Sequence, residues 1–208
     1  MHRFQVIVMT ALMAFSLAAC NGAKTGGAAG ALPDDMSMGD PKAKVTVVEY
    51  ASVGCPVCGR WQKEVYPAFK TKYIDTGKVN YVFREMLVGG GSEVAVASGG
   101  FLLARCAGKD KYFAVNDAVF AAQPGVFEAP RETLVTIAKS MGMTEDQFNK
   151  CVSDEKQLLA LNNRVEANAK QGVNSTPTFV VNGKKLEAGY TPLETLDAAI
   201  AEAQAAAK

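Results

Sequence analysis

Histidine is almost absent from this sequence of 208 residues, because the single one, His2, lies at the extreme N-terminus. The rest of the chain can therefore build neither a Cys/His zinc site nor a protease of the Cys-His type, and it has no histidine to act as a general base. Net charge is also nearly absent, since 22 basic and 21 acidic side chains leave only +1. A balance of this kind gives no electrostatic reason to expect nucleic acid as a partner.

A hydrophobic run long enough to cross a bilayer comfortably is missing from the N-terminal region. The uncharged stretch at residues 6–19 is too short for that. It follows His2 and Arg3 and ends in small residues, which is typical of an export signal, so residues 1–19 are expected to be a signal peptide. We therefore expect the mature protein outside the cytoplasm, on the periplasmic side of a bacterial cell envelope.

The end of this signal, Leu17-Ala-Ala-Cys20, resembles a bacterial lipobox. That resemblance implies that Cys20 is lipidated and anchors the protein to a membrane, although the leaflet stays open. The alternative is ordinary cleavage nearby, which would release a soluble protein. Residues 20–40 are rich in Gly and Ala, so we expect a lipid-anchored flexible tether with a reach of roughly 25 Å.

The remaining residues, 41–208, are expected to form one domain. The whole chain is 49% hydrophobic and 21% charged, which is the composition of an ordinary globular protein rather than of a disordered, collagenous or coiled-coil one. Its length suits one domain, or one domain with a large insertion.

Five cysteines are an odd number for an oxidising compartment, and lipidation of Cys20 would leave four. Cys55 and Cys58 stand in a Cys-Pro-Val-Cys motif, which is typical either of half a metal site or of a redox pair. A zinc site of four thiolates would have to recruit the distant Cys106 and Cys151. A redox pair without metal or bound cofactor is therefore favoured. The alternative, a plain stabilising disulfide, would close a loop too short to constrain the unfolded chain much.

The surroundings of this motif support the redox interpretation. Residues 45–50 read as a buried strand directly before it, and an apolar stripe with helical spacing follows it, at Trp61, Val65, Phe69 and Tyr73, with Pro67 expected to kink the helix. Cys55 would then lie at a helix N-terminus, where unpaired N–H groups and the helix dipole stabilise a thiolate. Pro56 suits the first helical position, and Cys58 is one turn away, where it could resolve a mixed disulfide.

The rest of the sequence predicts an α/β fold. A second strand at residues 79–83 would complete a strand-helix-strand unit with parallel strands. Several helical patterns then follow one another between about residues 92 and 171. Strands at residues 178–181 and 185–188 flank an Asn-Gly turn typical of a hairpin. Thr191-Pro-Leu-Glu194 predicts the start of a final helix, with a capping box and with proline at its first position.

One further motif, Val-Asn-Ser-Thr176-Pro177-Thr-Phe, places proline immediately before an apolar strand. X-Pro is the only common setting for a cis peptide bond, and such a turn can bring the backbone of Thr176 beside a reactive site. A trans proline that merely starts the strand is the alternative.

Together, the Cys-Pro-Val-Cys motif after a strand, the helical insertion, the Thr-Pro-Thr-Phe segment and Asn182-Gly-Lys resemble the DsbA-like family of thioredoxin-fold oxidoreductases over about residues 40–203. The resemblance implies a thioredoxin fold. In it, a large helical insertion at about residues 92–171 separates the strand-helix-strand half from the C-terminal hairpin-helix half.

The resemblance also implies roles for single residues. Cys55 would attack or be attacked and Cys58 would resolve, while Thr176 and cis-Pro177 would pack against the pair and bind substrate backbone. Glu49, six residues before Cys55, would be a buried acid that assists proton movement; a solvated or edge-strand glutamate is the alternative.

One position departs from the family's pattern. Many strongly oxidising members carry histidine just before the second cysteine, where this chain has Val57. Without that histidine the thiolate should be less stabilised and the disulfide should be a milder oxidant.

Cys106 and Cys151 both fall in the expected insertion. An oxidising compartment would tend to pair them if the fold brings them within reach. We expect a structural disulfide; two separately buried cysteines or a regulatory redox pair are the alternatives.

The sequence thus favours an enzyme that donates the Cys55–Cys58 disulfide to exported proteins and is reoxidised by a membrane partner. A disulfide isomerase or reductase, kept reduced by another membrane protein, is the second hypothesis. The third is a lipoprotein without catalytic activity that binds a soft metal such as Cu(I) through the two thiols, or that binds a protein partner.

Overall fold

A computed structural model describes residue 32 and residues 34–207 of the chain. Its centre is a sheet with the strand order β1-β3-β2-β4-β5. The strands are β1 (Met36–Gly39), β2 (Thr46–Ala51), β3 (Asn80–Glu85), β4 (Thr178–Val181) and β5 (Lys184–Lys185). β2 and β3 are parallel, whereas the other neighbouring strands pair antiparallel. The parallel pair comes from the expected strand-helix-strand unit, which confirms the α/β thioredoxin fold.

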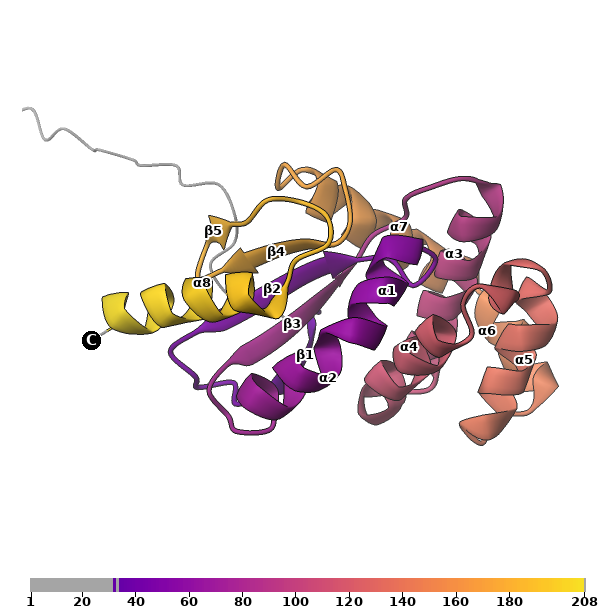
Figure 1. Ribbon diagram of the computed structural model, residues 1–208. Helices are drawn as coiled ribbons and strands as arrows, with labels where there is room; N and C mark the ends of the chain where they lie inside the picture. The colour runs from indigo at the N-terminus through magenta and orange to yellow at the C-terminus, as the bar shows by residue number, and fades with distance from the viewer. Residues whose placement is uncertain (1–31, 33, 208) are drawn as a thin grey trace, which may run out of the picture.

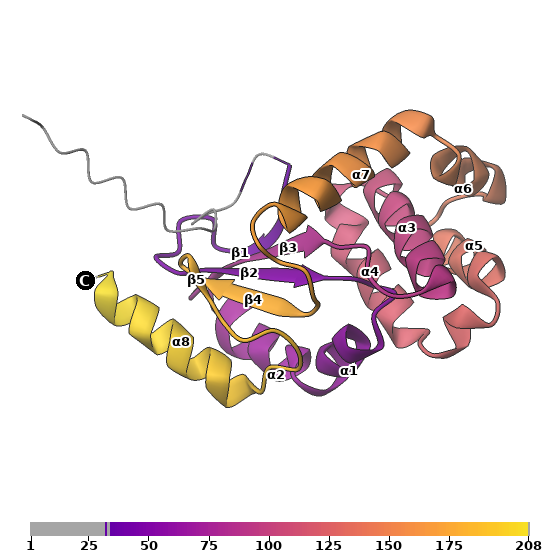
Figure 2. The same cartoon turned by 90° about the horizontal axis from the view of Figure 1, so that it is seen from above.

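Both faces of the sheet are covered, so every residue of β3 and every residue of β2 after Thr46 is buried. One face carries Val47 and Phe179 into the main core, and the other carries Val48 and Val180 into a smaller cluster. Figure 2 shows α1 (Pro56–Glu64), α2 (Tyr66–Phe69) and α8 (Leu193–Ala206) on one side of the sheet, with α7 (Glu155–Ala169) approaching from the other.

The helix after β2 is anchored by the expected apolar stripe. Trp61 is fully buried; its ring centroid lies 4.8 Å from that of Phe179, and its Nε1 donates a hydrogen bond of 2.9 Å to Thr191 O. The helix is interrupted at Val65, just before the position of Pro67, so that α1 and α2 are separate, and a π-helical turn at Lys70–Ile74 follows. The interruption occurs where a proline would leave a helical carbonyl without its partner.

The expected helical insert lies between β3 and β4. It consists of α3 (Gly91–Cys106), α4 (Tyr112–Ala121), α5 (Pro130–Ser140), α6 (Glu145–Val152) and α7, with short 3-10 turns at Lys109–Lys111 and Gly125–Phe127. Figure 1 shows α3 to α6 grouped beyond the carboxyl ends of β2 and β3. The end of the sheet at which β2 leads into Cys55 therefore faces the insert. Among the helices of the described residues, none combines the length and the apolar character needed to cross a bilayer.

A buried carboxylate joins the sheet to the insert. Glu85, at the end of β3, is 1% exposed and pairs with Arg105 of α3 at 2.7 Å and with Arg164 of α7 at 2.6 Å. The hydroxyl of Tyr112 on α4 donates to the same carboxylate at 3.1 Å. A buried charge that loses a partner is strongly destabilising. This network therefore holds the insert in a fixed position against the sheet.

Three local expectations are wrong. Residues 36–39 are not part of a tether, because β1 pairs with β3 at the edge of the sheet. A four-residue strand directly after a Gly- and Ala-rich stretch is too short to be recognised by its pattern. β5 spans Lys184–Lys185 rather than residues 185–188. The last helix begins at Leu193 with Pro192 at the N-cap position, so neither the capping box of Thr191 nor the proline at the first helical position is present. The Thr191 hydroxyl donates to Gly189 O instead.

The expected signal peptide at residues 1–19 and the lipidation site at Cys20 lie outside the described residues.

Candidate active site

The two motif cysteines lie at the junction of β2 and α1. Cys55 is the N-cap of α1, and Pro56 occupies the start of the helix, where a missing N–H costs no hydrogen bond. The preceding turn is held by a hydrogen bond from Cys55 N to Ser52 O at 3.0 Å. Cys55 is 7% exposed and Cys58 is completely buried, and both are free thiols. A reagent or substrate thus reaches Cys55 first.

The helix N-terminus makes the two thiols electrostatically different. Cys55 Sγ accepts the backbone N–H of Cys58 at 3.3 Å. Hydrogen bonding from the Cys58 thiol, aided by the Thr176 side chain and by backbone N–H groups, lowers the pKa of Cys55 to about 6. Burial and the neighbouring Cys55 raise the pKa of Cys58 well above its ordinary value. At neutral pH the pair therefore holds a thiolate at Cys55 and a thiol at Cys58.

The proline loop is 121 residues further along the chain but lies against the first cysteine. Cys55 Sγ is 3.7 Å from Thr176 O, and the Thr176–Pro177 peptide bond is cis. The hydroxyl of Thr176 is buried and has no oxygen or nitrogen partner within the described part of the chain. It is therefore available to the sulfur atoms. The loop that contains Pro177 therefore lies against Cys55.

Glu49 lies beneath the cysteines in β2, the central strand between β3 and β4, and is 1% exposed. Its carboxylate accepts a hydrogen bond from the hydroxyl of Tyr81 on the neighbouring strand. Burial, with a smaller contribution from the charge of Cys55, raises the pKa of Glu49 to about 8, although the Tyr81 hydrogen bond opposes this. A carboxyl group of this kind can hold or release a proton near neutral pH.

The outer side of α1 is partly apolar. Val57 is 39% exposed beside Cys55. One turn later the Arg60 guanidinium lies 4.3 Å from the centroid of the Tyr190 ring, and the Tyr190 hydroxyl donates to Glu64 at 2.8 Å. These contacts tie α1 to the loop before α8. They join segments about 130 residues apart, so no local sequence signal points to them.

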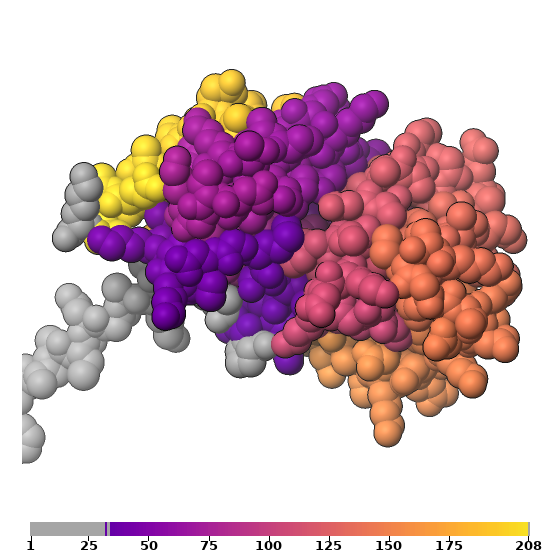
Figure 3. Space-filling view, turned by 90° about the horizontal axis from the view of Figure 1, so that it is seen from below, coloured from indigo at the N-terminus to yellow at the C-terminus, as the bar shows by residue number. Residues whose placement is uncertain are grey.

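A cleft of about 820 Å³ separates α1 from the insert. It is lined by Pro56, Gly59 and Lys63 of α1, by Asp117 and Phe120 of α4, and by Gln123 after α4. Burial raises the pKa of Asp117 to about 6, against a hydrogen bond from Gln62 at 2.8 Å. In the space-filling view of Figure 3, the α1–α2 segment and the insert are two lobes that meet at a common boundary.

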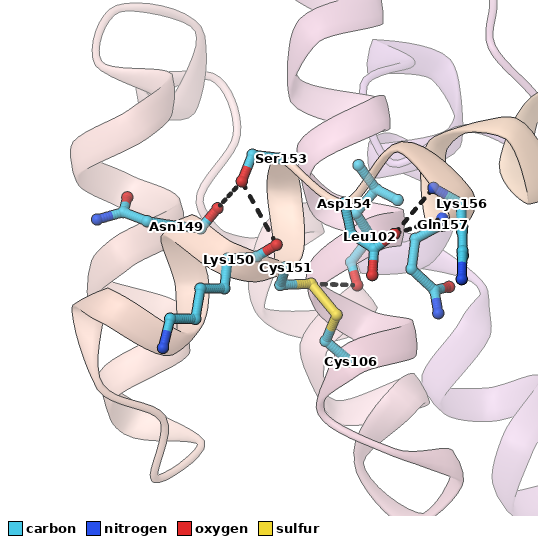
Figure 4. Close-up of a disulfide and its surroundings, with 9 residues drawn as sticks. All are labelled: Leu102, Cys106, Asn149, Lys150, Cys151, Ser153, Asp154, Lys156 and Gln157. Atoms are coloured by element: carbon cyan, nitrogen blue, oxygen red, sulfur yellow. Dashed lines mark hydrogen bonds between the residues drawn. A yellow bond between two sulfur atoms is a disulfide. The ribbon is translucent and has the colours of Figure 1, made fainter.

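The other two cysteines form a separate pair. Cys106, the last residue of α3, and Cys151, in α6, form a disulfide with a Cα–Cα distance of 6.2 Å. Figure 4 shows the bond inside the insert, where Cys151 Sγ lies 3.1 Å from Leu102 O. The pairing expected from the sequence is thus present, between the C-terminal end of α3 and α6.

The fold and the cysteine site define a thioredoxin-type protein, and comparison with known proteins agrees. A family model described as thioredoxin matches residues 31–202, so the chain belongs to the thioredoxin family.

Within the family its neighbours are DsbA-like. The crystal structure of Wolbachia pipientis alpha-DsbA1 superposes with a TM-score of 0.75 at 29% identity, covering 86% of this chain and 94% of that one. A thioredoxin-like oxidoreductase from Silicibacter pomeroyi gives a TM-score of 0.67 at 27% identity, covering 84% of this chain and 94% of that one.

A similar sequence is a putative protein-disulfide oxidoreductase of Rickettsia bellii, which is 34% identical over 175 residues. These cover 82% of this chain but 64% of the Rickettsia protein. The chain therefore spans less than two thirds of that relative's length.

Proposed function

We propose that the chain is a thiol-disulfide oxidoreductase that donates its Cys55–Cys58 disulfide to other proteins. The observation that carries the proposal is the asymmetry of the pair: the thiol with the lowered pKa is also the more exposed of the two, at 7% against 0%. The similar sequence of a putative protein-disulfide oxidoreductase and the DsbA-like structural neighbours support the same reaction.

The exchange proceeds in two balanced steps. A substrate thiolate attacks the sulfur of Cys55, the Cys55–Cys58 bond breaks, and Cys58 leaves as a thiolate that takes up a proton. A second substrate thiolate then attacks the substrate sulfur of this mixed disulfide and releases Cys55 as a thiolate. The substrate loses two electrons and the enzyme gains them.

Local groups fit each step of this exchange. Because the leaving Cys58 is buried and its pKa is raised, Glu49 is the group we assign to supply its proton. The backbone of Thr176, before cis-Pro177, lies where it can align the substrate chain beside Cys55.

Donation is the favoured direction because the lowered pKa of Cys55 stabilises the reduced enzyme, which makes its disulfide oxidising. Val57 in place of a histidine implies a milder oxidant. We further propose that the substrates are exported proteins, that a membrane protein reoxidises the pair, and that a lipid on Cys20 holds the domain on the periplasmic side of the envelope.

The test is oxidation of a reduced, unfolded protein with glutathione disulfide as the terminal oxidant. The chain should accelerate disulfide formation, and Cys55→Ser should abolish the acceleration while leaving the circular dichroism spectrum unchanged. The same assay with a scrambled-disulfide substrate separates the alternatives. Rearrangement without net oxidation would replace the donor proposal with an isomerase, and an inactive wild-type chain would refute the proposal.

A further inference from the structure

Two glycines bracket the cysteine motif, Gly54 directly before Cys55 and Gly59 directly after Cys58. A Cβ atom on Gly54 would lie 2.0 Å from Glu93 O, and one on Gly59 would lie 2.3 Å from Gln123 Oε1. Both distances are shorter than any normal contact. At Gly54 the opposing atom is backbone, so only glycine allows this approach, whereas at Gly59 it is the end of a flexible side chain that can move. Glu93 and Gln123 both belong to the insert, which therefore touches the motif at its two ends.

Gln123 makes the more specific of these two contacts. It follows α4 and is half-buried, and its Nε2 donates a hydrogen bond of 2.7 Å to Val53 O. Its other amide atom, Oε1, lies over Gly59. One side-chain amide thus spans the motif, from the residue two before Cys55 to the residue after Cys58.

The hydrogen bond to Val53 acts on the turn that holds Cys55. That turn is closed by Cys55 N donating to Ser52 O, and Gly54 N lies 3.3 Å from Ser52 Oγ. The position of the turn relative to α1 sets the 3.3 Å contact between Cys58 N and Cys55 Sγ. A group that fixes Val53 and rests on Gly59 therefore fixes both ends of that contact.

We propose that Gln123 is a positioning residue of the exchange reaction: it locks the helical insert onto the turn before Cys55 and holds Cys55 Sγ where Cys58 N–H reaches it. The inference rests on the proposed function. It gives the insert a direct part in setting the redox balance of the pair, in addition to shaping the protein.

The primary variant is Gln123→Ala, compared with Gln62→Ala. Gln62 is the matched control because it makes the same kind of link between α1 and α4, from its Nε2 to Asp117 at 2.8 Å, without touching the turn. Two quantities are measured on the full chain: the pKa of Cys55, from thiolate absorbance, and the equilibrium constant of the Cys55–Cys58 pair with glutathione.

Gln123→Ala should raise the pKa of Cys55 and make the disulfide less oxidising. The equilibrium constant should change by about threefold to tenfold, which corresponds to the loss of one hydrogen bond. Gln62→Ala should leave both quantities unchanged.

A second variant reaches the same contact from the other side. Gly59→Ala places its Cβ against the Gln123 amide, which can turn away because it is the end of a flexible side chain. It should reproduce the shift of Gln123→Ala, and the double variant should shift no further, because the two changes remove one interaction. This variant keeps the test valid if Gln123→Ala fails to fold.

An unchanged pKa and equilibrium constant in the folded variants would overturn the proposal, as would an equal shift in Gln62→Ala or fully additive shifts in the double variant. Wild-type protein whose Cys55–Cys58 pair does not equilibrate with glutathione would instead refute the proposed function. The thiolate absorbance of Cys55 reports on Gln123 in either case.

Discussion

The chain holds two cysteine pairs that differ in nearly every physical respect. Cys55 and Cys58 are three residues apart at a helix N-terminus, and the pKa of Cys55 is lowered to about 6. Cys106 and Cys151 are 45 residues apart and join two helices of the insert. A bond that closes a long loop removes much entropy from the unfolded chain, whereas one that closes a four-residue loop removes little. The same side chain thus serves exchange chemistry in one place and cross-linking in the other.

The largest expected effect comes from removing the sulfur of Cys55, which the substrate attacks. Cys55→Ser should lower the rate of disulfide exchange by about a thousandfold or more, since the thiolate is the reacting group. Cys58→Ser cannot form the internal disulfide and should not oxidise a reduced substrate. Given a disulfide-bonded substrate, its Cys55 thiolate should attack one substrate sulfur and release the other as a thiolate, and the mixed disulfide at Cys55 should accumulate because no Cys58 resolves it, as detected by mass spectrometry. Exchange that persists in Cys55→Ser would move the reaction to the other pair.

The second change removes the other pair. Cys106→Ala with Cys151→Ala should lower the free energy of unfolding by about 4 kcal/mol, the chain-entropy value for a loop of this length. Urea denaturation measures it, with Cys55 and Cys58 kept in one redox state. The rate at which Cys55 is alkylated should not change. Slower alkylation of Cys55 together with unaltered stability would contradict the assignment of cross-linking to Cys106–Cys151 and of exchange to Cys55–Cys58.

The exchange site contains a buried acid, Glu49, whose titration provides a separate test of this site. Its pKa is 4.5 as an ordinary glutamate and about 8 in the folded protein. The folded state therefore binds an extra proton between these values, and its stability falls as the pH rises from about 5 to 8.

Glu49→Gln should remove most of this decline, which amounts to a few kcal/mol across the window. The part below about pH 6 that comes from Asp117, whose pKa is also raised by burial, should remain. The experiment uses protein with both pairs oxidised, so that no thiol titrates. Because the charge of Cys55 is then absent, burial raises the pKa of Glu49 without its help and the decline should end somewhat below pH 8. Glu166→Gln, on an exposed helix surface, is the control and should leave the decline in place. A variant of Glu49 that keeps the wild-type slope would show that this carboxyl is already ionised.

The smallest expected effect concerns the reactivity of Cys55 with pH. A pKa of about 6 predicts that alkylation of the reduced protein accelerates about tenfold between pH 5 and pH 7 and then levels off. Cys58 should stay unmodified in this range because it is buried and its pKa is raised. A pH midpoint of alkylation near the ordinary pKa of cysteine would show that the Cys55 thiol is not activated.

Much of the exchange site could be predicted from the sequence, because Cys55, Pro56 and Cys58 follow one another and their chemistry depends on a local helix start. Pro177 was found through a motif that precedes a strand. In contrast, Gln123 and Tyr81 act through contacts with segments far away in the chain, and nothing in their immediate neighbours marks them. β1 is not predictable for another reason: four residues at a sheet edge carry too little periodicity.

The most direct test of the account is the reduction potential of each pair, read by thiol trapping after equilibration at graded ratios of reduced to oxidised glutathione, with the two pairs scored separately. The account predicts that Cys55–Cys58 is reduced at a potential well above that of thioredoxin, about −270 mV, while Cys106–Cys151 stays oxidised. A Cys55–Cys58 potential at or below that of thioredoxin would contradict disulfide donation, and reduction of both pairs together would contradict their separate roles.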